Sequence, residues 1–219
     1  MDLQTQRLMM AAAGAVGGAT YVDDVFSTYV YEGDGTTSHQ IVNGIDLATH
    51  GGLIWGKERG NSGSHYQFDT ERGLNKRLKS NSNSAEETDT FYSSVNSNGY
   101  TINKTTSVNV NGNDYASWTF RKAPGCFDIV TYTGNGTAGR QLSHNLGCAP
   151  GMVAIKCTSD SHNWSVWHRG LSSNAKTITL NDSAAEFTND AFNGAAPSST
   201  VIHLSSTNAS NANTKTYVA

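Results

Sequence analysis

Residues 26–36 read Phe-Ser-Thr-Tyr-Val-Tyr-Glu-Gly-Asp-Gly-Thr, and residues 127–137 read Phe-Asp-Ile-Val-Thr-Tyr-Thr-Gly-Asn-Gly-Thr. The two stretches share a phenylalanine, a tyrosine, two glycines and a threonine at matching positions. Each begins with strand-forming residues and ends in a glycine-rich run that is typical of a tight turn. Self-similarity of this kind indicates a repeated structural unit, so the sequence predicts two copies of one β module.

The repeat continues in the same order along both halves of the chain. Residues 52–57 (Gly-Leu-Ile-Trp-Gly-Lys) match residues 151–156 (Gly-Met-Val-Ala-Ile-Lys), and an Arg-Gly-Leu follows in each half. Short bursts of alternating apolar and polar residues, separated by Gly, Asn, Asp and Ser, are typical of antiparallel strands and hairpins. We therefore predict an all-β protein with two tandem antiparallel β-sandwich modules, residues 26–123 and 124–219, behind a short helical or extended arm, residues 1–25.

The second copy reaches the end of the sequence within a strand. Copy one finishes with Tyr115-Ala-Ser-Trp-Thr-Phe120, whereas copy two stops after Tyr217-Val-Ala219. Losing half of this strand would leave a sheet edge unpaired. We expect the chain to be the N-terminal part of a longer polypeptide.

Composition excludes several classes of function. The 219 residues carry a formal net charge of -3, which offers no electrostatic grip on phosphate backbones, so no nucleic-acid partner is expected. No stretch approaches the roughly 20 apolar residues of a membrane span, so membrane insertion is not expected either. The three cysteines, Cys126, Cys148 and Cys157, lack CxxC spacing and are expected to be reduced and mostly buried.

Residues 3–13 differ from the rest of the chain because they are good helix formers in a row. Leu3, Arg7 and Met10 follow helical spacing, and glycines at 14, 17 and 18 would end the helix and form a hinge. An exposed arm rich in Leu and Met predicts a docking segment, with a frayed tail as the alternative.

Motifs for chemistry are weak. Residues 134–139 fit the GxGxxG pattern, but no amphipathic helix follows and copy one repeats the turn, so a hairpin is favoured over a nucleotide site. The loop around Ser62 resembles a protease nucleophile loop only loosely, the histidines are scattered, and carboxylates such as Glu86 and Glu87 are adjacent in sequence rather than facing each other. We expect no catalytic residue, no cofactor and no metal site.

One aromatic segment is a candidate for ligand contact. Alternation in Trp164-Ser-Val166-Trp167 places Trp164 and Val166 on one face of a strand and Trp167 on the other. At least one face must be core, and sandwich packing is the favoured role for these rings. Trp167, His168 and Arg169 remain candidate glycan contacts.

Several motifs together carry a resemblance to a known group of proteins. They are the N-terminal stretch Leu3 to Ala13, the linker Thr20 to Phe26, and the module pattern with Tyr132-Thr-Gly-Asn-Gly-Thr, His144-Asn-Leu-Gly-Cys-Ala-Pro-Gly-Met-Val, Lys156, Trp164 and His168. With these features the chain resembles the tail-fibre and related virion structural proteins of cyanophages and other marine phages. Copy one departs from the pattern, because Thr49-His-Gly51 replaces the Ala-Pro turn.

The resemblance implies structural work in the tail of a virion. The arm would bind tail adaptor or nozzle proteins, fibres of this kind are commonly homotrimers, and a distal region would meet a host surface receptor. The residues that match the anchoring stretch are Gln4, Arg7, Leu8, Met9 and Met10, and those that match the linker are Tyr21, Asp23, Asp24 and Phe26.

We therefore expect a non-catalytic phage tail fibre, with this chain as its N-terminal, proximal part. Two alternatives stay open. The first is a lectin-like, glycan-binding module of a virion protein, which exposed aromatic side chains on one sheet face would favour. The second is a depolymerase fragment, which would need a facing pair of carboxylates in a groove.

Overall fold

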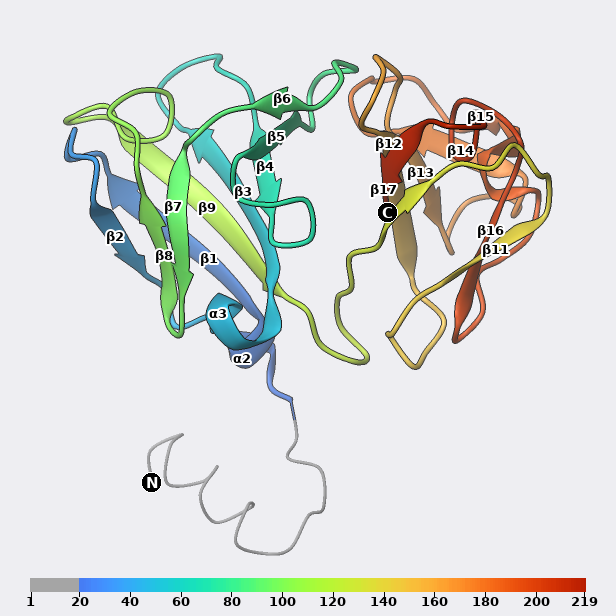
Figure 1. The fold of residues 1–219 in the computed structure, drawn as a ribbon, viewed down its shortest axis with the longest axis horizontal. Coiled ribbons are helices and arrows are strands. Elements are labelled where there is room, and N and C mark those ends of the chain that lie inside the picture. The colour runs from blue at the N-terminus through green and yellow to red at the C-terminus, as the bar shows by residue number, and fades with distance from the viewer. Residues whose placement is uncertain (1–19) are drawn as a thin grey trace, which may run out of the picture.

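The computed structural model describes residues 20–219 as two β modules that lie side by side (Figure 1). Module 1 comprises residues 26–123, with a short helix before it, and module 2 comprises residues 124–219. The elements up to the end of module 1 are α2 (Val22–Val25), β1 (Phe26–Glu32), β2 (His39–Val42), α3 (Leu47–His50), β3 (Gly52–Glu58), β4 (Tyr66–Asp69), β5 (Lys76–Lys79), β6 (Glu87–Thr88), β7 (Tyr92–Asn96), β8 (Gly99–Ile102) and β9 (Asp114–Arg121).

Module 2 repeats this arrangement. Its elements are β10 (Thr131–Thr133), β11 (Arg140–Ser143), β12 (Met152–Cys157), β13 (Ser165–His168), β14 (Lys176–Thr179), β15 (Phe187–Thr188), the 3-10 helix η1 (Asp190–Phe192), β16 (Val201–Leu204) and β17 (Thr216–Val218). The fold is all-β, as predicted.

The two large sheets have the same strand order. They run β1-β9-β3-β4-β5-β6 and β10-β17-β12-β13-β14-β15, with each strand of one in the place of its counterpart in the other. All pairings are antiparallel. A small sheet lies over each large one, β2-β8-β7 in module 1 and β11-β16 in module 2. In module 2, η1 takes the place of β7, and β16 takes the place of β8. The two copies inferred from sequence thus share one topology.

A stacked tyrosine pair lies in each core. Tyr31 stacks on Tyr115 with ring centroids 5.1 Å apart, and Tyr132 stacks on Tyr217 at 5.2 Å. The hydroxyl of Tyr31 donates to a backbone carbonyl in the loop before β9, and the hydroxyl of Tyr132 does the same before β17. Because these buried hydroxyls are satisfied, the rings can fill the core without a desolvation penalty.

The repeated glycine turn is a feature of the fold. The side chain of Asn109 accepts from the backbone N–H of Asp34, and Asn211 accepts from that of Asn135. A Cβ on Gly33 would lie 2.2 Å from the carbonyl oxygen of Val110, so only glycine allows this approach. Strand β11, not a helix, follows the second turn, which therefore lacks the helix N-terminus that a pyrophosphate site needs.

The two modules are joined by a third apolar cluster. Leu78 of module 1 packs with Ile129, Trp164 and Val218 of module 2, and all four are buried. The backbone N–H of Glu86 also donates to the carbonyl of Thr158 at 2.9 Å. The outer faces of both large sheets take part in this contact, so each of these sheets is covered by protein on two sides where the modules meet.

Of the predicted arm, residues 1–25, the structure describes residues 20–25. The anchoring residues Gln4, Arg7, Leu8, Met9 and Met10 lie outside the described residues. Tyr21 precedes α2, Asp23 and Asp24 lie within it, and Phe26 begins β1.

Of the three cysteines, Cys157 is buried, but Cys126 and Cys148 are exposed, so the expectation of mostly buried thiols was wrong. Among residues 20–219, no helix is long and apolar enough to span a membrane.

Candidate functional site

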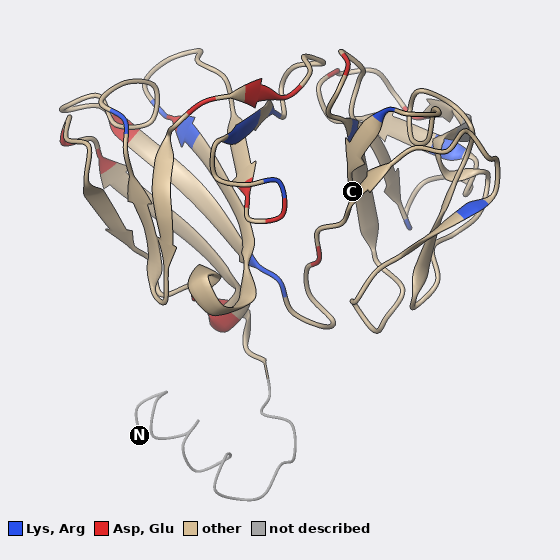
Figure 2. Cartoon of the chain, in the orientation of Figure 1, with Lys and Arg blue, Asp and Glu red and all other residues tan. Residues whose placement is uncertain are grey.

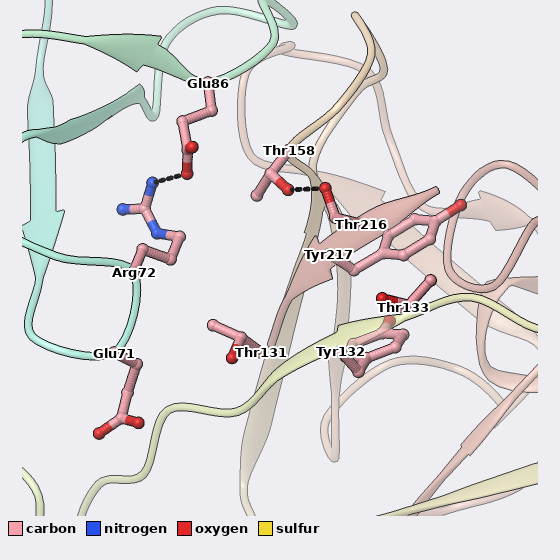
Figure 3. A pocket seen from close by; sticks show the side chains of 9 residues that line it. All are labelled: Glu71, Arg72, Glu86, Thr131, Tyr132, Thr133, Thr158, Thr216 and Tyr217. Carbon is pink, nitrogen blue, oxygen red and sulfur yellow. Dashed lines mark hydrogen bonds and ion pairs between the residues drawn. The ribbon is translucent and has the colours of Figure 1, made fainter. Parts of the chain in front are cut away.

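A groove of about 530 Å³ runs between the two modules (Figure 3). Module 1 contributes charged side chains to it, and module 2 contributes mainly threonines. The lining residues are Glu71, Arg72, Glu86, Thr131, Tyr132, Thr133, Thr158, Thr216 and Tyr217.

Arg72 forms the module 1 wall, in the turn that follows β4. Its Nε lies 2.6 Å from Oδ2 of Asp69, and its Nη1 lies 3.0 Å from Oε2 of Glu86. Asp69 also accepts from the backbone N–H of Arg72 at 2.8 Å, which fixes the turn. Both side chains of the Asp69–Arg72 pair are buried, so the guanidinium is held on two sides by carboxylates. Because its charge is already neutralised by Asp69 and Glu86, the Arg72 guanidinium is not available to bind an anionic ligand.

The two glutamates of the groove are both ion-paired. Glu86 contacts Arg72 and lies 3.5 Å from the ammonium of Lys76. Glu71 lies 2.7 Å from Nζ of Lys122, which is also 3.5 Å from Asp128. Burial alone would lower the pKa of Lys122, but the hydrogen bonds and charges of Glu71 and Asp128 together outweigh it and raise that pKa. Paired in this manner, the glutamates make structural contacts between segments rather than a free acid and base.

The module 2 wall is a row of threonines on the outer face of the large sheet. Thr133 of β10 pairs with Thr216 of β17, and Thr216 accepts from the backbone N–H of Thr158 at 2.8 Å. The hydroxyls of Thr158 and Thr216 share a hydrogen bond of 2.7 Å. Thr131, Thr133 and Thr216 are exposed. This wall offers hydroxyl groups that can both donate and accept hydrogen bonds.

No aromatic ring forms a platform in the groove. Tyr132 and Tyr217 line it, but Figure 3 shows their rings stacked on one another, and both are buried in the module 2 core. The groove can therefore contact a polar ligand through hydroxyls and charges, without the ring stacking that many sugar sites use.

The ring of Trp167, a candidate glycan contact, has the packing role that the sequence favoured for it. Trp167 is 4% exposed and packs in the module 2 core, in the position that Phe68 holds in module 1. Its ring therefore offers no face to a ligand. His168 and Arg169 are exposed at the end of β13, away from the groove residues, and their role stays a prediction.

Trp164 is also buried, on the opposite side of the strand. It is 5% exposed and lies between the modules. The alternation in the sequence correctly placed Trp164 and Trp167 on opposite faces. What it could not show is that module 1 covers the second face.

The groove itself was not predicted, because its residues come from distant parts of the chain. The repeated Arg-Gly-Leu pointed to Arg72, but it matched Arg72 with Arg169, which is exposed. In the structure, the counterpart of the Arg72–Glu86 contact is made by Ser172 and Glu186. The useful signal was thus the glutamate that recurs before β6 and β15.

Comparison with known proteins gives a single result. The model of a family described as a domain of unknown function, DUF7483, matches residues 22–219, which span both modules. No curated protein and no solved structure matches the chain. Within the described part of the chain, no group of three or more His, Cys, Asp or Glu side chains is placed to hold a metal ion.

Proposed function

The chain belongs to this DUF7483 family, and we propose that it is a non-catalytic structural protein of a virion, the proximal part of a phage tail fibre. The observation that carries the proposal is the apolar joint between two copies of one module. A fibre must hold its successive modules in a fixed direction, and a buried joint does so where a flexible linker would not.

The joint supports the proposal through both its packing and its hydrogen bonds. Leu78 and Trp164 bury apolar surface from the two modules against each other. Two hydrogen bonds between the modules, to the carbonyls of Lys79 and Thr158, add direction to this contact. Relative motion of the modules would break both, so they should move as one body.

The surface also suits a particle that is exposed to its surroundings. Charged residues make up 15% of the chain. In module 1 they concentrate around β5 and β6 (Figure 2), where Arg77 contacts Glu87 and Asp89, and Lys104 contacts Asp89 at 2.5 Å. Most charges around β5 and β6 are paired with one another. The rest of the module 1 surface is polar and carries few charges.

The arm has a separate role in this proposal. Gln4, Arg7, Leu8, Met9 and Met10 would bind a tail adaptor or nozzle protein, and the linker residues would lead into module 1. Several copies of the chain, a homotrimer by the resemblance, would make one fibre, and a distal region would meet the host receptor.

Incorporation into phage tails tests this function. The full chain with Leu8→Asp and Met9→Asp should fold as the wild type does but should be missing from purified particles assembled in its presence. Val42→Asp is the control, because Val42 is 54% exposed on β2, outside the arm. Equal incorporation of all three chains would overturn the anchoring role.

A second candidate function is glycan binding, and the groove favours it. The exposed hydroxyls of Thr131, Thr133 and Thr216 line one wall of a polar groove, where they can donate hydrogen bonds to saccharide hydroxyls and accept hydrogen bonds from them. Calorimetry with a panel of oligosaccharides should then show binding by the wild type and its loss in Thr133→Val and Thr216→Val. A wild-type chain that binds none of them would remove this candidate.

A further inference from the structure

The outer face of the large sheet in module 1 is unusually apolar. Two cross-strand rows lie on it, one with Phe26, Phe120 and Leu53 and the other with Thr28, Trp118 and Trp55. In a two-layer antiparallel fold, the face turned away from the core is normally polar. We call the part formed by Phe26, Val30, Trp55, Trp118 and Phe120 the aromatic face.

Rings on this face pack against each other. Trp55 and Trp118 meet edge to face with centroids 5.9 Å apart, and Phe26 and Phe120 lie 4.8 Å apart. Val30, beside them on β1, is 60% exposed. Figure 2 shows charged residues on β1 and β9 only at the strand ends, so the middle of the face carries no charge.

Module 2 shows what this face does in the same fold. At the counterparts of Thr28, Trp55 and Ala116 it has Ile129, Ala154 and Val218, and these pack against Leu53 and Leu78 of module 1. The face is therefore a protein contact in module 2. Of the three module 1 side chains, Trp55 is larger than its counterpart, whereas Thr28 and Ala116 are smaller. Phe127 of module 2 contacts an edge of the face through Phe120.

His65 of module 1 and Trp164 of module 2 occupy equivalent positions but differ in the hydrogen bonds of their rings. The backbone N–H of His65 donates to Asn81, as that of Trp164 donates to Asn181, so the two rings hold equivalent positions. Trp164 donates its ring N–H across the joint to module 1. Two buried ring nitrogens have no hydrogen-bond partner among residues 20–219. They are Nε1 of Trp55, on the aromatic face, and Nδ1 of His65, whose ring contacts that of Trp55.

We propose that the aromatic face is a self-association surface, which packs against the aromatic face of another copy of this chain. The proposal deepens the fibre assignment and rests on it for the number of copies. A protein surface fits better than a saccharide, because a saccharide needs several hydrogen-bonding partners and Thr28 carries the one hydroxyl of the two rows.

The mass of the full chain in solution, measured by sedimentation equilibrium over a range of concentrations, tests the proposal. Wild type should form assemblies of two or three copies. Val30→Lys and Thr28→Lys place a charge on exposed positions of edge strand β1 and should weaken the association constant about 10-fold or more. Val42→Lys is the matched control, since it changes an equally exposed valine on the edge strand of the small sheet and should associate as wild type does.

Circular dichroism and thermal unfolding of each variant confirm that the modules remain folded. A monomeric wild type would overturn the proposal, whether residues 1–19 or a ligand covers the face. Equal association of Val30→Lys and Val42→Lys would overturn it too. A wild-type dimer that Val30→Lys dissociates would support the aromatic face as the contact surface and would count against a trimeric fibre. Incorporation into particles tests the fibre assignment separately.

Discussion

The indole Nε1 of Trp164 donates a hydrogen bond of 3.0 Å to the backbone carbonyl of Lys79, and the two residues belong to different modules. The ring also packs in the apolar cluster with Leu78 and Val218. The Trp164 side chain therefore supplies both apolar packing between the modules and a hydrogen bond that fixes their relative orientation. Its energetic role can be measured separately from that of the cores.

Replacing Trp164 by Phe should cost roughly 1 kcal/mol of unfolding free energy, because it removes the hydrogen bond across the joint and leaves the Lys79 carbonyl with only the longer bond, 3.3 Å, from the backbone N–H of Ser82. Trp167→Phe is the matched control. The Trp167 ring nitrogen has no partner among the described residues, and Phe68 fills the equivalent place in module 1. Urea unfolding should show a larger loss for Trp164→Phe. An equal loss in both variants would mean that the hydrogen bond across the joint contributes nothing.

The fully buried Lys156 should make stability depend on pH. Burial lowers the pKa of its ammonium to about 8, and Nζ donates to the carbonyl of Cys157 at 2.6 Å. The unfolded chain holds this proton up to a pKa of about 10.4. Between pH 8 and 10 the unfolded state thus binds more protons than the folded state, and stability from this group rises with pH.

Comparison with Lys156→Met isolates this effect. The unfolding free energy of wild type relative to the variant should rise by about 2 kcal/mol from pH 7 to pH 10. Lys57→Met is the matched control, since it removes the half-buried lysine at the same position of module 1. A difference between wild type and Lys156→Met that stays constant with pH would show that Lys156 titrates normally.

Arg72→Met should destabilise the protein by about 3 kcal/mol, because it leaves the buried carboxylate of Asp69 without its cation. Lys122→Met removes the more exposed pair with Glu71 and the longer contact, 3.5 Å, with Asp128, whose carboxylate keeps two backbone N–H donors, and should cost less than Arg72→Met does. Chemical denaturation of both variants at one pH gives the comparison. Similar small losses would indicate that the groove wall is not held by the Asp69–Arg72 pair.

Gly33→Ala should be destabilising by more than about 1 kcal/mol, because the new methyl group would meet the backbone oxygen of Val110. Gly134→Ala should behave alike in module 2, where the Cβ would lie 2.0 Å from the carbonyl oxygen of Ala212. Gly60→Ala serves as the control, since no atom lies within 4 Å of its added Cβ. Midpoints of thermal unfolding separate the three. A tolerated Gly33→Ala would show that the repeated turn can move away from β9.

Much of the fold could be predicted from local patterns. The paired stretches around Tyr31 and Tyr132 predicted the two modules, and alternation predicted their antiparallel strands, because strand periodicity and turn chemistry depend on neighbouring residues. The alternation around Val166 also placed Trp164 and Trp167 on opposite faces. These properties needed no knowledge of the rest of the chain.

The groove and the aromatic face depend on contacts between distant segments. Arg72 meets Thr158 and Thr216 across the groove because the modules pack through Leu78 and Trp164, and no local pattern encodes which face one module presents to another. The cysteines show the same limit, since Cys126 and Cys148 are exposed despite their apolar character.

By itself, the sequence determined that this is a duplicated β protein, because residue spacing sets strands and turns directly. Only the tertiary structure decided that Trp167 lies in a core and Trp164 in a joint, and that Trp55 and Trp118 lie on an outer sheet face. The physical reason is that burial is a property of the partner surface. An aromatic ring lies in a core, between modules or half-buried on an outer sheet face according to which segment packs over it.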